Sequence, residues 1–276
     1  MKNKSRIDLL LVERGLFASR EKAQAAIMAH RIRINHQPVT KAGTLVTDDV
    51  QVEIVGDEIP YVSRGGLKLQ KALEVFEVSV QGKKAVDIGA STGGFTDCLL
   101  QHGASRVWAI DVGYGQLAWK IRTDNRVTLL ERTNIRTFAP EQLGDVADIA
   151  VIDVSFISLT LVLPVVSKLL VQPGDLIALV KPQFEAGPKQ VGSRGVIRDT
   201  KVHQQVIARV IANAQAGGWQ FRGLTFSPLR GREGNTEFLL WLDNRSVNLQ
   251  ISPDFQQIIS HTVDDACEYF SKDAKH

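Results

Sequence analysis

The sequence predicts an α/β protein in which a doubly wound, mostly parallel sheet follows a small α+β unit. One observation is the stretch 85–99, AVDIGASTGGFTDCL, where an apolar run leads into a glycine-rich turn and then into helical spacing. This strand–loop–helix opens doubly wound domains, whose ligands lie across the carboxyl ends of the parallel strands. A second observation is the alternation of strand and helix patterns after residue 84, which is typical of a parallel sheet. A third is the charge, because residues 1–41 carry nine Lys and Arg against three acids, while the whole chain has a net charge of +3. A basic amino-terminal segment followed by a nearly neutral remainder indicates that the amino end contacts a polyanion.

Length and composition restrict the class of protein. With 276 residues, 44% of them hydrophobic and 23% charged, the chain can form two globular domains. Its two cysteines, Cys98 and Cys267, lack the spacing of a zinc site or a disulfide framework. We therefore expect no metal and a reducing compartment, the cytoplasm. The start has no signal-peptide core, and the longest apolar stretch, near 159–166, is far shorter than the ~20 residues of a membrane span.

Three segments are expected along the chain. Gly56 and Pro60, with two acids between them, are typical of a linker, so the first boundary falls near residue 60. The segments are a small amino-terminal domain (1–60), an α/β domain (61–245) and a helical tail packed on the α/β domain (246–276). In the tail, helical spacing over 252–270 predicts an inner face of Phe255, Ile258, Ile259, Val263 and Cys267.

The amino-terminal domain is expected to combine two helices with short strands. Gly15 is expected to end the first helix and Ser19 to cap the second. The predicted helices are 7–14 and 20–29, and the predicted strands are 31–35, 37–40 and 49–55. Arg31 and Arg33 alternate with two isoleucines, so the arginines share one face of a strand, which suits contacts with phosphates.

The run RIDLLLVERGLFASREKAQAAIMAHRIRINHQPVTKAG, residues 6–43, resembles the small RNA-binding domain of ribosomal protein S-four, which many pseudouridine synthases share. This resemblance implies structured RNA as a partner. The basic residues expected to contact the RNA are Arg6, Arg20, Lys22, Arg31 and Arg33.

Seven strand patterns follow in the α/β domain, with helical patterns between most of them. The predicted strands are 84–88, 106–112, 127–131, 149–154, 176–180, 220–227 and 237–242, and the predicted helices are 94–101, 116–121, 159–170 and 200–216. The last two strands have no helix between them. This order is similar to that of the methyltransferases that use S-adenosylmethionine, a Rossmann-like fold in which the seventh strand is inserted antiparallel.

The glycine-rich turn carries the first candidate site. Ser91 stands at the second glycine position of a dinucleotide fingerprint, which disfavours a pyrophosphate. Asp87, just before the turn, suits a cation such as an amino group or a sulfonium, and Asp111 is placed to accept hydrogen bonds from ribose hydroxyls. The pattern predicts an adenosine-containing cofactor and favours S-adenosyl-L-methionine. The residues expected to hold it are Asp87, Gly89, Ala90, Ser91, Gly93, Gly94 and Asp111.

Charged residues at strand ends form the second candidate site. Asp153 and Lys181 follow apolar strands, and Glu237 begins the last strand, so all three are expected at the ligand-binding edge of the sheet. A lysine there can act as a base or can stabilise a developing alkoxide, and neighbouring carboxylates orient it. Lys68, taken alone, is an ordinary helix lysine. Cys98 lies on the apolar side of its helix and is expected in the core rather than as a nucleophile.

Six motifs together resemble one family. In chain order they are VSRGGLKL, DIGASTGGFTDCLL, DVGYGQL, DVSFISL, LVKPQFEAG and GNTEFLLWL. Behind the RNA-binding domain, they resemble the haemolysin-A-like (TlyA-type) ribosomal RNA 2′-O-methyltransferases, whose catalytic half is similar to FtsJ-type RNA ribose methyltransferases. The resemblance implies a Lys–Asp–Lys–Glu catalytic tetrad at Lys68, Asp153, Lys181 and Glu237. It also implies a ribose, in a cytidine of 16S or 23S ribosomal RNA or both, as the methyl acceptor.

The partner expected is therefore ribosomal RNA or a ribosomal subunit, with no insertion into a membrane and with a monomer or a weak dimer as the working form. The loop 183–199 follows Lys181 and is expected to grip RNA through Lys189 and Arg194, the alternative being an ordinary surface loop. Other functions stay open at this point. They are a non-catalytic RNA- or ribosome-binding protein, a membrane-lysing protein of the kind that the haemolysin label suggests, and a nicotinamide-dependent enzyme, which Ser91 and Lys181 disfavour.

Overall fold

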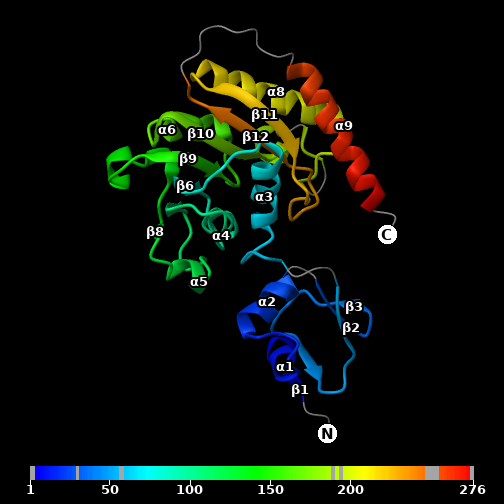
Figure 1. Cartoon of the computed structure of the whole chain (residues 1–276). Helices are drawn as coiled ribbons and strands as arrows, with labels where there is room; N and C mark the ends of the chain where they lie inside the picture. The colour runs from blue at the N-terminus through cyan, green and yellow to red at the C-terminus, as the bar shows by residue number, and fades with distance from the viewer. Residues whose placement is uncertain are drawn as a thin grey trace. The chain divides into compact units, whose positions relative to one another are not determined.

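The computed structural model describes residues 4–28, 31–55, 59–187, 190–192, 195–245 and 255–273. The chain forms two compact units, Met1–Arg64 and Gly65–His276, which follow one another along the chain in Figure 1. We call them the first and the second unit.

The first unit packs two helices against short strands. The helices are α1 (Ile7–Glu13) and α2 (Arg20–Met28), and the strands are β1 (Lys4–Arg6), β2 (Ile32–Ile34), β3 (Gln37–Pro38), β4 (Leu45–Thr47) and β5 (Val52–Ile54). β1 pairs antiparallel with β4, while β2 lies between β3 and β5. The fully buried Ile7, Leu11, Ile27 and Ile32 join both helices to the sheet.

The local signals read from this unit are confirmed, and two strands are added. Gly15 has a positive φ of 68° just after α1, and the Ser19 hydroxyl accepts a hydrogen bond from the Lys22 amide at the start of α2. The predicted strand 31–35 is shorter, because Asn35 and His36 both have positive φ and form the hairpin turn. β1 and β4 were not predicted, since three-residue strands carry too little periodicity to be seen.

The second unit is built on a seven-stranded sheet. Its strands are β6 (Lys84–Ile88), β7 (Arg106–Ile110), β8 (Val127–Leu130), β9 (Ala147–Ile152), β10 (Leu170–Val180), β11 (Gln220–Phe226) and β12 (Phe238–Asp243). Their order in the sheet is β11-β12-β10-β9-β6-β7-β8. β6 to β10 are parallel, and β12 runs antiparallel to both β10 and β11. The predicted Rossmann-like sheet with an antiparallel seventh strand is confirmed.

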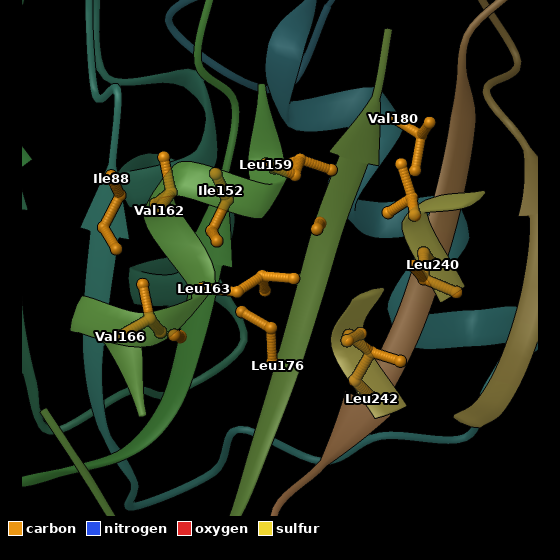
Figure 2. Close-up of a cluster of buried hydrophobic side chains, with 14 of the residues drawn as sticks. Ile88, Ile152, Leu159, Val162, Leu163, Val166, Leu176, Val180, Leu240 and Leu242 are labelled. Carbon is orange, nitrogen blue, oxygen red and sulfur yellow. The ribbon is translucent and has the colours of Figure 1, made fainter. Parts of the chain in front are cut away.

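Helices cover the sheet. They are α3 (Gly65–Val75), α4 (Gly94–Gln101), α5 (Trp119–Arg122), α6 (Leu159–Val166), α7 (Pro182–Glu185), α8 (Thr200–Ala216) and α9 (Phe255–Asp273), with the 3₁₀ helices η1 (Ile135–Thr137) and η2 (Pro140–Leu143). Figure 2 shows Val162 and Leu163 of α6 among Ile88, Ile152 and Leu176 of the sheet, and the same core includes buried residues of α8 and α9. Asp87, between two core residues of β6, therefore points to the other face, where it meets α4.

Three sequence predictions need correction. The predicted helix 159–170 ends at Val166, because the chain turns at Ser167 and β10 already begins at Leu170. The predicted helix 116–121 is only the short α5. In the tail, Cys267 is exposed, and the buried stripe of α9 is Ile259, Val263, Ala266 and Phe270. One residue of a helix turns by about 100°, so a stripe that passes through Ala266 leaves Cys267 outside.

Candidate active site

The predicted catalytic residues come together at one edge of the sheet. β6, β7, β9 and β10 are parallel and end at this edge, whereas the antiparallel β12 begins there. Asp153 follows β9, Lys181 follows β10, and Glu237 precedes β12. Val180 pairs with Phe238 across β10 and β12, so Lys181 and Glu237 lie just beyond this pair, at the ends of neighbouring strands.

Lys181 forms an ion pair with Asp153. Its Nζ lies 2.6 Å from Asp153 Oδ1 and donates a hydrogen bond of 2.9 Å to Ser155 Oγ. The Lys181 side chain is only 11% exposed, so little water competes for the ammonium. The backbone of Asp153 is fixed as well, because its amide donates to the carbonyl of Ile88 at the end of β6. The result is a lysine whose amine is held at a defined point of the sheet edge.

Lys68 forms the second ion pair, with Glu237. Lys68 lies on α3, and its Nζ is 2.5 Å from Glu237 Oε2. The Glu237 side chain is 3% exposed, and its backbone carbonyl accepts a hydrogen bond from the Ser227 amide. The four residues of the predicted tetrad therefore form two lysine–carboxylate pairs in the second unit.

The glycine-rich loop between β6 and α4 passes close to the Lys181 pair. Gly89 has a φ of 87°, and a Cβ added there would lie 2.4 Å from the carbonyl oxygen of Asp153. Gly93, with a φ of 95°, precedes α4, and a Cβ there would lie 2.9 Å from Leu117. Ala90 of the loop and Gly94, the first residue of α4, are both buried. Glycine is required at both positions of positive φ, since a side chain would push the loop away from its neighbours.

Asp87 is a buried carboxylate with one oxygen that lacks a hydrogen-bond partner among the described residues. It is fully buried, and its Oδ2 accepts a hydrogen bond of 2.6 Å from Thr96 Oγ1. Within the described part of the chain, its Oδ1 has no hydrogen-bond partner. Burial, reinforced by the nearby charge of Asp153, raises the pKa of Asp87 to about 7. A ligand that carries a positive charge or a donor group fits such an oxygen.

Asp111 links the end of β7 to the glycine loop. Its Oδ2 accepts the amide of Ser91 at 2.8 Å, and its Oδ1 accepts the amide of Gly113 at 2.6 Å. Ser91 itself has a positive φ of 48°. Each carboxylate oxygen can accept a second hydrogen bond, so Asp111 keeps capacity for the two hydroxyls of a ribose. Asp87, the glycine loop and Asp111 together fit the adenosine and amino-acid parts of S-adenosylmethionine.

An exposed aromatic side chain stands next to the Lys181 pair. Phe156 is 91% exposed and has a φ of 63°, which is unusual for a bulky residue. Its ring centroid lies 4.8 Å from that of Phe184 on α7, and Lys181 Nζ lies 6.0 Å from the Phe184 ring. Sequence reasoning did not select Phe156; the available signal was a bulky aromatic residue in a polar loop, directly after the serine of DVSF and past the end of the strand.

In the first unit, two of the predicted RNA-binding arginines share a buried acid. Asp8 is fully buried and accepts hydrogen bonds from Arg6 at 3.0 and 2.9 Å, from Arg20 at 2.9 Å and from Gln24 at 2.7 Å. The Arg6 guanidinium, followed by the other donors, holds the pKa of Asp8 well below its usual range. Asp8 thus fixes both arginines while about half of each side chain stays exposed. The sequence showed Asp8 only as one acid among the basic residues.

The other predicted RNA-binding residues differ in how they are placed. Lys22 and Arg33 are exposed, and Arg31 is half-buried with its Nε donating to the Val55 carbonyl. Ile32, beside them, is buried, so the predicted alternation along β2 is confirmed. Lys189 and Arg194 lie outside the described residues.

Three further features concern the buried cysteine, possible metal ligands and membrane-spanning helices. Cys98 is buried, which confirms that it belongs to the core. Among the described residues, no cluster of three or more His, Cys, Asp or Glu could hold a metal ion. No helix in the described part of the chain is long and apolar enough to cross a membrane.

Comparison with known proteins gives consistent results over most of the chain. Residues 61–244 match the family described as FtsJ-like methyltransferase, and residues 5–52 match the S4 domain. YqxC of Bacillus subtilis, which bears a provisional rRNA methyltransferase name, is 53% identical over 240 residues, covering 87% of this chain and 85% of that protein. TlyA of Mycobacterium tuberculosis, named a 16S/23S rRNA (cytidine-2′-O)-methyltransferase, is 47% identical over 243 residues, covering 88% and 91%. A solved structure from Streptococcus thermophilus with a provisional hemolysin name has a TM-score of 0.79 and 43% identity, and each chain is covered completely.

Proposed function

We propose a reaction for this chain from one premise: it belongs to the FtsJ-like methyltransferase family, with an S4 domain ahead of the methyltransferase part. The reaction is the transfer of a methyl group from S-adenosylmethionine to the 2′-hydroxyl of a cytidine ribose in ribosomal RNA. The relative from Mycobacterium tuberculosis is named for this reaction on 16S and 23S rRNA, and we extend it to this chain, acting on ribosomal subunits in the cytoplasm.

One observation carries the proposal, namely the Lys181–Asp153 pair at the sheet edge beside the glycine loop. A ribose hydroxyl is a very weak acid, so its oxygen becomes a nucleophile only when its proton is drawn away or its developing charge is stabilised. Lys181 Nζ, held by Asp153 Oδ1 and Ser155 Oγ, can stabilise the developing negative charge as an ammonium. As a neutral amine, after giving a proton to Asp153 or water, it can instead accept the proton of the hydroxyl. Because the donor is already in place, it does not have to reorient when negative charge develops on the ribose oxygen.

The cofactor site follows from the loop next to this pair. Asp87 would face the positively charged amino-acid part of S-adenosylmethionine, and Asp111 would accept hydrogen bonds from its ribose. The cofactor supplies a methyl group activated by a sulfonium. Gly89 allows the loop to lie against the Asp153 backbone, so that bound cofactor and Lys181 would be close to one another.

The Lys68–Glu237 pair is proposed to bind and orient the target nucleotide rather than to move its proton. Glu237 is almost fully buried and faces Lys68 at 2.5 Å, so the pair is a rigid element at the neighbouring strand. Holding the reacting groups in the right geometry can supply a large part of the acceleration of a reaction.

Phe156 is proposed to stack on the base of the target nucleotide. Proteins that recognise RNA by sequence mostly bind single-stranded loops, whose unstacked bases stack on aromatic side chains instead. Phe156 offers an open ring next to Lys181, backed by Phe184 at 4.8 Å. Stacking on an aromatic side chain contributes about 1–3 kcal/mol per base.

The test uses purified protein, S-adenosylmethionine with a labelled methyl group, and 30S subunits, 50S subunits and naked rRNA as separate substrates. Digestion of the RNA to nucleosides is expected to yield labelled 2′-O-methylcytidine. Label on a base, or on a ribose of another nucleoside, would contradict the proposal.

A further inference from the structure

Glu185, the last residue of α7, reaches back to the start of α6. Its Oε2 accepts a hydrogen bond of 2.7 Å from Ser158 Oγ, and its Oε1 accepts one of 2.7 Å from the Leu159 amide. The first amides of a helix have no partner within the helix, and the helix dipole favours a negative charge there. The carboxylate therefore caps α6 from a different part of the chain.

This contact joins the two loops that form the Lys181 pair. Asp153 and Ser155, both of which contact Lys181 Nζ, lie in the loop between β9 and α6. Lys181 immediately precedes α7, which Glu185 ends. The Glu185 carboxylate thus connects the segment that carries the amine to the segment that carries its two partners.

α7 has a second anchor on α8. The Arg209 side chain of α8 donates a hydrogen bond to the Glu185 carbonyl. With α8 holding the backbone of Glu185 and the Glu185 side chain holding α6, the end of α7 cannot shift without breaking contacts on two helices. The contact between Phe156 and Phe184 joins the same two segments, the loop after β9 and α7.

We propose that Glu185 is a positioning residue for methyl transfer, which sets the Lys181 amine against Asp153 by tying α7 to the start of α6. The effect on catalysis rests on the proposed function, whereas the link between α7 and α6 rests on the hydrogen bonds of Glu185 alone. A misplacement of about 1 Å in a reacting group can cost roughly a hundredfold in rate, and a four-residue helix such as α7 has little internal stability to hold its own place.

Three variants separate positioning from a general loss of structure. Glu185→Ala removes both accepted hydrogen bonds. Glu185→Gln keeps Oε1 for the Leu159 amide and can donate its amide to Ser158 Oγ, so it is the conservative variant. Glu141→Ala, at an exposed glutamate of η2, is the matched control.

The first measurement is single-turnover methyl transfer to ribosomal subunits, together with cofactor affinity by calorimetry. We expect Glu185→Ala to slow transfer about tenfold or more while the Kd for S-adenosylmethionine stays within about twofold, because the tether acts on Lys181 and not on the glycine loop. Glu185→Gln is expected to recover most of the rate. An Ala variant as fast as wild type, or a Gln variant as slow as the Ala variant with weakened cofactor binding, overturns the inference.

The second measurement does not depend on any methyltransferase activity. Limited acetylation with an N-hydroxysuccinimide ester, followed by peptide mass spectrometry, reports how accessible each lysine is. Lys181 and Lys68 are similarly shielded, at 11% and 12% exposed, so Lys68 is the internal reference. We expect faster labelling of Lys181 alone in Glu185→Ala, and unchanged labelling of Lys181 overturns the inference. Wild-type protein that methylates no rRNA refutes the proposed function instead, and the labelling result then still decides the tether.

Discussion

Asp87→Asn tests whether the buried carboxyl of the candidate cofactor site has a raised pKa. Asp87 is fully buried with a pKa raised to about 7, mainly by burial. In the unfolded chain the same carboxyl titrates near 3.8. Between these two values the folded state holds a proton that the unfolded state releases, so the free energy of unfolding falls as pH rises through this window. An asparagine at position 87 does not titrate, so the free energy of unfolding of the variant should not fall for this reason as pH rises.

The magnitude follows from the two pKa values. Raising a carboxyl pKa from 3.8 to about 7 corresponds to roughly 4 kcal/mol when the group is fully ionised, of which roughly 3 kcal/mol develops between pH 5 and pH 8. The substituted side chain keeps an oxygen for Thr96 Oγ1 and places an unpaired amide where Asp87 Oδ1 now lies, a cost that is the same at both pH values. The difference in stability between variant and wild type should therefore shift by roughly 3 kcal/mol in favour of the variant on going from pH 5 to pH 8.

Urea unfolding without cofactor at pH 5, 6, 7 and 8 measures this shift. All four tryptophans lie in the second unit, so their fluorescence reports the unit that contains Asp87. Asp124→Asn is the control, because the Arg126 guanidinium lowers the pKa of Asp124 and the carboxyl is ionised in both states from pH 5 to pH 8. If the difference between Asp87→Asn and wild type is the same at pH 5 and pH 8, Asp87 does not titrate in this range and the reasoning fails. The variant is also expected to bind S-adenosylmethionine more weakly than wild type at pH 8.

Three further predictions follow from the site. Lys181→Ala should abolish methyl transfer while calorimetry shows unchanged cofactor affinity, and loss of both would make Lys181 a structural residue. Phe156→Ala should lower kcat/KM for ribosomal substrate by about 5- to 150-fold, the equivalent of one lost stacking contact of about 1–3 kcal/mol, with Phe156→Tyr close to wild type; equal losses in both would argue against stacking. Arg33→Glu should weaken rRNA binding in filter assays without changing cofactor affinity, whereas Arg20→Glu should also unfold the first unit more easily, because it sets a second carboxylate against buried Asp8; RNA affinity that survives Arg33→Glu would move the RNA surface elsewhere.

The fold could be predicted from the sequence because its signals are local. Each parallel strand is a short apolar run, and the glycine loop after β6 combines close approach with positive φ at Gly89 and Gly93. The first unit could be predicted through Gly15 and Ser19, which mark helix ends by their own backbone chemistry. A helix end such as that of α6 was harder, since the apolar run continues from the helix into β10 with little break in composition.

Which lysine pairs with which carboxylate could not be predicted, because the contacts join residues far apart in sequence. Lys68 and Glu237 are 169 positions apart, and no periodicity relates one to the other. Asp8 was visible only as a charge, although it collects two arginines and a glutamine beneath the surface expected to bind RNA. In the sequence Glu185 is only one acid of the loop 183–199, and nothing there shows that its carboxylate lies at the start of α6.

The two lysines of the candidate tetrad therefore have different surroundings, which the order of motifs alone does not reveal. Lys181 Nζ meets a partly exposed carboxylate and a hydroxyl beside the glycine loop, where it can exchange a partner for an incoming ribose. Lys68 Nζ meets a carboxylate that is almost fully buried, and removing either member leaves an unpaired charge that is costly away from water. Lys181 is thus suited to exchange its contacts with Asp153 and Ser155 during the reaction, whereas the Lys68–Glu237 pair is suited to stay fixed.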